Sequence, residues 1–126
     1  MGIAKKNKRK IIYQNKEFYW WVLEKIGDNG NMLEINIASE DKSFLISYFT
    51  IQDQAENKYL TVIGKSFPGL KIKKGNWQRF ICPDFIPDIR DNGISPKNVV
   101  FILKWCFNLE KKLIPVNYKG QIINNE

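Results

Sequence analysis

The acidic side chains that could do chemistry gather in one segment of the chain. Asp84, Asp88 and Asp91 follow one another closely, with Arg90 among them. Clustered carboxylates can hold Mg²⁺ for phosphodiester cleavage, and this cluster therefore predicts, as one alternative, a metal-dependent carboxylate enzyme. Turn formation and an ion pair between aspartate and arginine explain the same residues with fewer assumptions. We therefore expect no metal site and no catalytic residue.

The sequence lacks the residues that most enzymes use near neutral pH. Histidine is absent throughout, which removes Ser–His–Asp and Cys–His nucleophilic systems, imidazole metal ligands and the usual general base. Cys82 and Cys106 stand inside apolar runs, where cysteine acts as a small buried hydrophobe. The glycines are isolated and form no phosphate-binding loop. We expect a protein that is not an enzyme and has no cofactor.

An aromatic pair flanked by lysines is the candidate partner-binding site. Phe101 and Trp105 are spaced i, i+4 in a segment that we expect to be helical, so they lie beside each other. The predicted site consists of these two rings and the polar residues of the neighbouring stripe, Lys97, Lys104 and Asn108. Such a patch suits a protein partner or stacked bases. The alternative is that residues 115–123 fold back and cover it.

Two groups of cations predict nucleic-acid binding as the alternative function. The first consists of Lys5, Lys6, Lys8, Arg9 and Lys10. The second consists of Lys71, Lys73, Lys74 and Arg79, and the aromatic ring of Trp77 lies among them. Single-stranded nucleic acid is bound by this combination, because cations attract phosphates and rings stack on bases. A solvated sheet face, or an edge strand protected by lysine, accounts for the second group equally well.

Charge and length divide the chain into a tail and one domain. The formal net charge is +7, and the first ten residues hold five of the 20 lysines and arginines but none of the 13 acids. We therefore expect residues 1–10 to form a basic, flexible tail and residues 11–126 to form a single domain. With 44% hydrophobic residues, a chain of 126 residues can fill one core. No apolar run is long enough to span a membrane, and we expect a cytoplasmic protein.

Hydrophobic periodicity predicts strands first and a helix afterwards. Strands are expected at residues 10–14, 17–25, 32–38, 44–52, 59–63, 70–73 and 77–82, with a short strand at 121–123. Within 32–38, the alternation places Ile35 inward and both Glu34 and Asn36 outward. Ser95 and Pro96 open the helix as N-cap and first residue, and the helix is expected to run to about Leu113.

The predicted helix has one broad apolar face toward the sheet. This face consists of Val99, Ile102, Leu103, Cys106, Leu109 and Leu113. The order of elements predicts an α+β fold, in which an antiparallel β-sheet of about five to seven strands packs against one C-terminal α-helix.

Two stretches of the chain carry a resemblance. The first is residues 11–22, a short strand followed by an aromatic strand with Phe18, Tyr19 and Trp20. The second is Ile94-Ser95-Pro96 leading into residues 99–105. Together they resemble small uncharacterised bacterial proteins that pair an N-terminal β-meander with a C-terminal helix. The resemblance implies this fold and a bacterial accessory protein, and it carries over no site residue.

Three functions from different classes follow from these features. The favoured function is a non-catalytic protein-interaction module, immunity-type or similar, whose partner is another protein. Nucleic-acid binding through the tail and the second group of cations is the alternative, and the carboxylate enzyme is the third. No membrane partner is expected, and self-association into a homodimer stays open.

Overall fold

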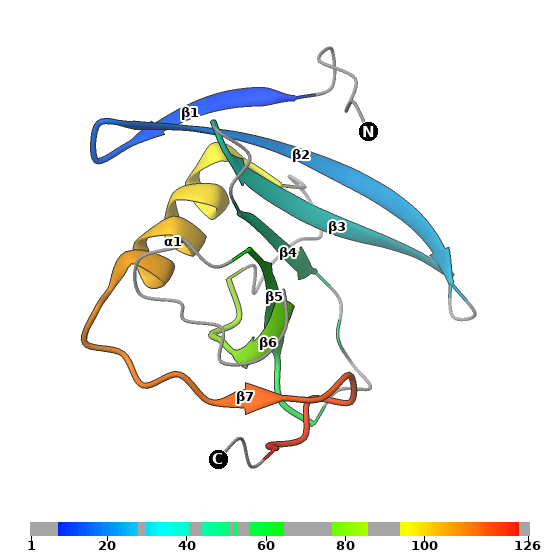
Figure 1. Cartoon of the computed structure of the whole chain (residues 1–126). Helices are drawn as coiled ribbons and strands as arrows, with labels where there is room; N and C mark the ends of the chain where they lie inside the picture. The colour runs from blue at the N-terminus through cyan, green and yellow to red at the C-terminus, as the bar shows by residue number, and fades with distance from the viewer. Residues whose placement is uncertain are drawn as a thin grey trace.

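The computed structural model describes residues 8–27, 30–40, 44–50, 52, 56–64, 77–85 and 94–123. Within them the chain forms seven strands and one helix (Figure 1). The strands are β1 (Arg9–Tyr13), β2 (Lys16–Gly27), β3 (Gly30–Ser39), β4 (Leu45–Phe49), β5 (Tyr59–Ile63), β6 (Trp77–Ile81) and β7 (Pro115–Val116), and the helix is α1 (Pro96–Phe107). The predicted α+β class is confirmed.

The sheet is an antiparallel meander in which strand order follows chain order from β1 to β7. Each strand therefore pairs with its neighbours in sequence, through a two-residue turn between β1 and β2 and through a long connection that contains α1 between β6 and β7. The turn between β1 and β2 illustrates this. Gln14 and Asn15 have φ values of 52° and 64°, and two positive φ angles are what a two-residue type I′ hairpin turn needs.

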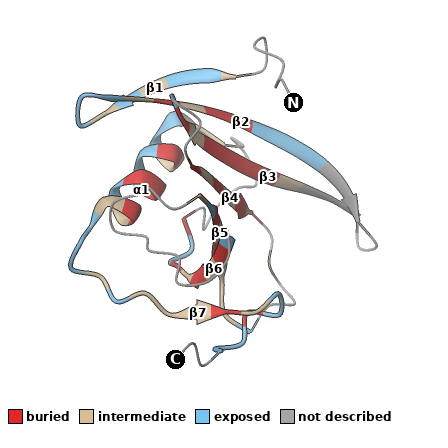
Figure 2. Ribbon diagram, viewed as in Figure 1, coloured by how far each residue is buried: buried red, intermediate tan, exposed pale blue. Residues whose placement is uncertain are grey.

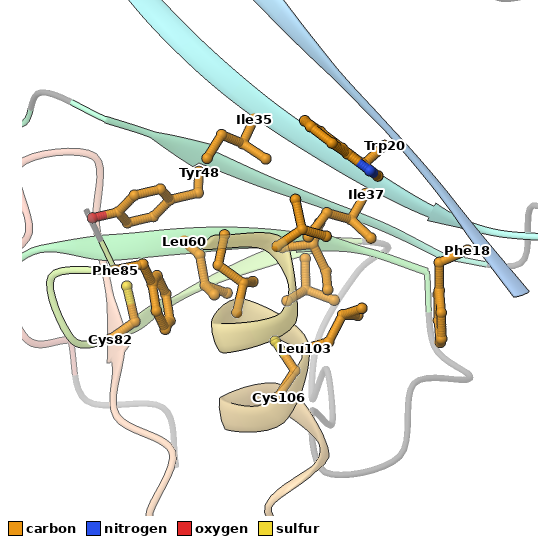
Figure 3. Close-up of a cluster of buried hydrophobic side chains, with 14 of the residues drawn as sticks. Phe18, Trp20, Ile35, Ile37, Tyr48, Leu60, Cys82, Phe85, Leu103 and Cys106 are labelled. Carbon is orange, nitrogen blue, oxygen red and sulfur yellow. The ribbon is translucent and has the colours of Figure 1, made fainter. Parts of the chain in front are cut away.

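One face of the sheet, called the inner face here, packs against α1 to form the core. Alternate residues of the strands point to the helix, among them Trp20, Ile37, Tyr48 and Leu60 (Figure 3). The helix contributes Val99, Ile102, Leu103 and Cys106, all fully buried (Figure 2). These four positions of the predicted apolar face are confirmed. Phe107 closes the end of this core through ring contacts with Tyr13 and Phe18 at 5.6 and 5.8 Å between centroids.

The helix begins where predicted but ends at Phe107 rather than near Leu113. Asn108 is extended, with φ −74° and ψ 105°. The Nζ atom of Lys111 donates hydrogen bonds to the carbonyls of Cys106 and Asn108 at 2.7 and 2.9 Å, which satisfies the last turn. Because the helical period stops there, Leu109 is 74% exposed, and its prediction as a core residue is wrong. Leu113 still packs against the core from the following segment.

Several predicted strand boundaries change. β1 begins at Arg9, so Arg9 and Lys10 belong to the sheet and not to the tail. The expected strand at 121–123 is reduced to a single bridge between Val116 and Ile122. The expected strand at 70–73 lies outside the described residues. No helix in the described part of the chain is long and apolar enough to cross a membrane.

Candidate functional site

The face of the sheet opposite α1, called the outer face here, carries no helix among the described residues (Figure 1). The strand register aligns one residue from each of five strands in a row across this face. This outer row consists of Trp21, Asn36, Ser47, Thr61 and Arg79. Its two ends and its middle have different surroundings.

The middle of the outer row is a closed hydrogen-bond network. Asn36 donates from Nδ2 to Oε1 of Glu34 at 3.3 Å, and its Oδ1 accepts from the Ser47 hydroxyl at 2.8 Å. Glu34 and Asn36 point away from the core as predicted, yet they are only 7% and 4% exposed. Their cross-strand neighbours Phe49 and Trp21 are large enough to shield them. Because this network satisfies its own polar atoms, it positions the strands and offers little to a ligand.

The Arg79 end of the row is an aromatic–cation cluster. The guanidinium of Arg79 lies 4.5 Å from the ring centroid of Trp77 and 5.8 Å from that of Tyr59. The Trp77 side chain is 50% exposed. Among the described residues, Arg79 has no carboxylate within ion-pair distance; the ion pair present there joins Lys10 to Glu17 at 3.0 Å. The guanidinium is therefore held in place against two aromatic rings.

The opposite end of the row also carries a cation. Lys8 places its Nζ 5.2 Å from the ring centroid of Trp21. Of the neighbouring cations, the exposed Arg9 lies over Trp20 at 5.4 Å, and Lys10 pairs with Glu17. Lys5 and Lys6 lie outside the described residues.

The second predicted group of cations is described only in part. Trp77 and Arg79 come together on β6, as the alternation of a strand requires. Lys71, Lys73 and Lys74 lie outside the described residues. The partner that the sequence did not reveal is Tyr59 of β5. Only the register of β5 against β6, in which Tyr59 pairs with Ile81 and Thr61 with Arg79, brings this ring to the guanidinium.

The predicted helix patch is partly used for packing. Phe101 and Trp105 both contact the buried ring of Phe85, at 5.2 and 6.0 Å between centroids. Phe101 is 45% exposed, whereas Trp105 is half-buried and also lies under Lys111, whose Nζ is 5.0 Å from its centroid. The polar residues of the predicted patch, Lys97, Lys104 and Asn108, are exposed.

The segment that the alternative interpretation places over the helix patch begins at the edge of the sheet. Pro115 and Val116 pair with β6 at the edge of the sheet, and Figure 1 shows β7 apart from α1. The contacts described for the two aromatic rings of the patch come instead from Phe85 and Lys111.

In the described part of the chain, the carboxylate of Asp84 is exposed and the thiols of Cys82 and Cys106 are buried. Asp84 is exposed and accepts a hydrogen bond from the Tyr48 hydroxyl at 3.5 Å, while Asp88, Arg90 and Asp91 lie outside the described residues. No three histidine, cysteine, aspartate or glutamate side chains gather there as a metal site would require. Cys82 and Cys106 are buried, as predicted, and unpaired. Burial raises the pKa of both thiols, which keeps them protonated and unreactive near neutral pH.

Comparison with known proteins adds no family: no family model, no curated protein and no solved structure matches this chain.

Proposed function

We propose that the protein is a non-catalytic domain that binds single-stranded nucleic acid on the outer face of its sheet. The observation that carries the proposal is the stacked pair of Arg79 and Trp77, a guanidinium 4.5 Å from a half-exposed indole ring. A base can stack on the exposed part of the ring, and a phosphate can accept hydrogen bonds from the guanidinium. A ligand that supplies both groups is a nucleotide chain.

The distribution of cations supports an extended anionic ligand. Lys8 lies over Trp21 at one end of the outer row and Arg79 is the other end, and the four strand spacings of the row span roughly 19 Å at 4.7–4.9 Å each. This length matches a single strand of a few nucleotides, the lower end of the range that small β-sheet domains bind. The net charge of +7 favours approach of a polyanion. A duplex suits the site less well, since its bases stack on each other and hide the faces that Trp77 would contact.

Fluorescence anisotropy with labelled oligonucleotides tests the proposal. We expect Trp77→Ala to raise the Kd for single-stranded DNA or RNA by about tenfold, because loss of one stacked base costs about 1–3 kcal/mol. Phe101→Ala is the matched control, since this ring has a similar exposed fraction but lies on the helix. Circular dichroism would establish that both variants are folded.

Three results would contradict the proposal. The first is wild-type protein that binds no oligonucleotide at near-physiological salt. The second is equal weakening by Trp77→Ala and Phe101→Ala. The third is binding that disappears when residues 1–7 are removed, because the tail would then account for the attraction without the sheet.

The second candidate function is the protein-interaction module, with α1 as its surface. It is supported by Val100 and Phe101, which are exposed between Lys97 and Lys104. Exposed apolar side chains between two cations suit an acidic protein partner. Under this proposal, Phe101→Ala abolishes recovery of a copurifying acidic protein and Trp77→Ala does not.

A monomeric mass by light scattering would exclude the homodimer. The cytoplasmic location and the bacterial accessory role stay predictions.

A further inference from the structure

We infer that the turn formed by residues 117–121 is a second base-and-phosphate subsite, in which Tyr118 stacks on a base and Lys119 binds a phosphate. This inference rests on the proposed function, because it extends the same interface beyond Arg79. The ligand it specifies is a single strand long enough to reach from Trp77 to Tyr118.

The backbone of this turn is fixed by its own hydrogen bonds. Asn117 donates from its backbone N–H to the Gln121 carbonyl at 2.9 Å, and Gly120 donates to the Asn117 carbonyl at 2.9 Å. The side-chain Oδ1 of Asn117 accepts from the backbone N–H groups of Lys119 and Gln121 at 2.9 and 3.1 Å. Gly120 has a φ of 74°, which a residue with a Cβ adopts only at a cost. Tyr118 and Lys119 are thus presented from a preorganised corner.

The turn is anchored to the segment that leads into β5 (Figure 1). The backbone N–H of Glu56 donates to the Lys119 carbonyl, and Nδ2 of Asn57 donates to the Gly120 carbonyl, both at 2.9 Å. The hydroxyl of Tyr59 donates to the Tyr118 carbonyl, also at 2.9 Å. Three hydrogen bonds therefore hold the turn at the edge of the outer face.

Tyr59 connects the two parts of the interface. Its hydroxyl holds the Tyr118 carbonyl, and its ring lies 5.8 Å from the guanidinium of Arg79. The backbone confirms that the parts are neighbours, because Val116, which precedes the turn, pairs with Arg79. The turn therefore lies next to the Arg79 end of the outer row.

The exposed residues of the turn repeat the chemistry of Trp77 and Arg79. Tyr118 is 65% exposed, and the Nζ of Lys119 lies 5.6 Å from its ring centroid. Two aromatic–cation pairs, linked by Tyr59, offer successive stacking surfaces and successive phosphate contacts along one edge. This arrangement fits an anionic chain of bases better than a single nucleotide, which would occupy one pair only.

A series of oligonucleotide lengths tests the inference on the full chain. Labelled DNA and RNA strands of about 2, 6 and 12 nucleotides cover the range from one pair to the whole edge. We expect Tyr118→Ala to weaken binding of the two longer strands about fivefold or more and to leave the shortest strand nearly unchanged. Lys119→Gln is expected to remove about one phosphate contact. The slope of log K against log salt for the longer strands should therefore fall by about 0.7. Leu109→Ala and Lys112→Gln, exposed positions in the connection after α1, serve as controls.

Tyr59→Phe distinguishes a positioning role from a direct contact. Removing its hydroxyl frees the Tyr118 carbonyl but keeps the ring beside Arg79, so binding of the long strands should weaken while the shortest strand is unaffected. If Tyr118→Ala and Lys119→Gln bind every length as the wild type does while Trp77→Ala is impaired, the second subsite is wrong and the proposed function stands. If the wild type binds no strand of any length, both are wrong. Weaker binding of the longer strands by Tyr118→Ala and Lys119→Gln, whether the strands are DNA or RNA, supports the subsite.

Discussion

The outer face of the sheet and the exposed flank of α1 carry the same kinds of side chains but use them differently. On the helix, the ring of Trp105 packs on Phe85, and its lysine, Lys111, hydrogen-bonds the carbonyls that end α1. On the sheet, Trp77 is half-exposed, and Arg79 stacks on it without a carboxylate partner among the described residues. The helix pair is engaged by packing and by hydrogen bonds at the end of α1, whereas half of the Trp77 ring is in solvent.

This comparison shows which contacts composition alone leaves out when it ranks the two surfaces. An aromatic ring beside a cation is a candidate binding site only where packing and capping have not already engaged both groups. The sequence contains both pairs, but the contacts that distinguish them come from residues distant along the chain. Phe85 contacts Trp105 of the helix pair, and Tyr59 contacts Arg79 of the sheet pair.

The largest expected difference between the two regions is in stability. Trp105→Ala should lower the free energy of unfolding by about 2–3 kcal/mol, because it removes a ring that packs against the core. Trp77→Ala should lower it by less than about 1 kcal/mol, since half of that ring is in solvent. Urea unfolding followed by far-ultraviolet circular dichroism measures both values. Equal losses would mean that the sheet pair is structural too.

The next effect concerns the cations and is read from binding. Arg79→Gln should weaken single-stranded oligonucleotide binding about fivefold or more, and it should reduce the slope of log K against log salt by about 0.7. Lys104→Gln removes the same charge from the helix and should change neither quantity by a comparable amount. Arg79→Lys sharpens the test, because it keeps the charge and loses the planar stack. If Lys104→Gln has the larger effect, the interface is on the helix.

The smallest effect separates two adjacent lysines after the helix. Lys111→Ala should lower the free energy of unfolding by about 1 kcal/mol, because it removes the hydrogen bonds to the carbonyls of Cys106 and Asn108. Lys112→Ala changes an exposed side chain and should stay within about 0.5 kcal/mol of the wild type. Thermal unfolding of the two variants checks the difference. If the two variants unfold at the same temperature, water forms hydrogen bonds with the last carbonyls of α1 as well as Lys111 does.

Much of the fold was predictable from local signals. The alternation within β3, the aromatic run of β2 and the Ser95-Pro96 start of α1 each reflect a short-range rule. The end of α1 was not predictable in this way, because Leu109 and Leu113 continue the helical period while Asn108 and Lys111 end the helix through hydrogen bonds. Periodicity records which residues are apolar and does not record which carbonyls a lysine can reach.

The candidate site was predictable only in part for a similar reason. Trp77 and Arg79 lie on one strand and already stand in one predicted group, and the structure brings them into contact. Tyr59 joins them through the register of β5 with β6, and Tyr118 joins through a hydrogen bond to Tyr59 from the end of the chain. These are relations between distant segments, and a single sequence carries no rule for them.

The central claim is that the ligand binds the outer face and not the helix. A ¹H–¹⁵N NMR titration of the full chain with a single-stranded oligonucleotide tests it most directly, because the four tryptophan indole signals report on separate parts of the fold. The account predicts that the indole signal of Trp77 and the amides of β6 and of residues 117–121 shift during the titration, while the indole signal of Trp105 stays in place. Shifts confined to Trp105 and the amides of α1, or no shifts at all, would contradict it.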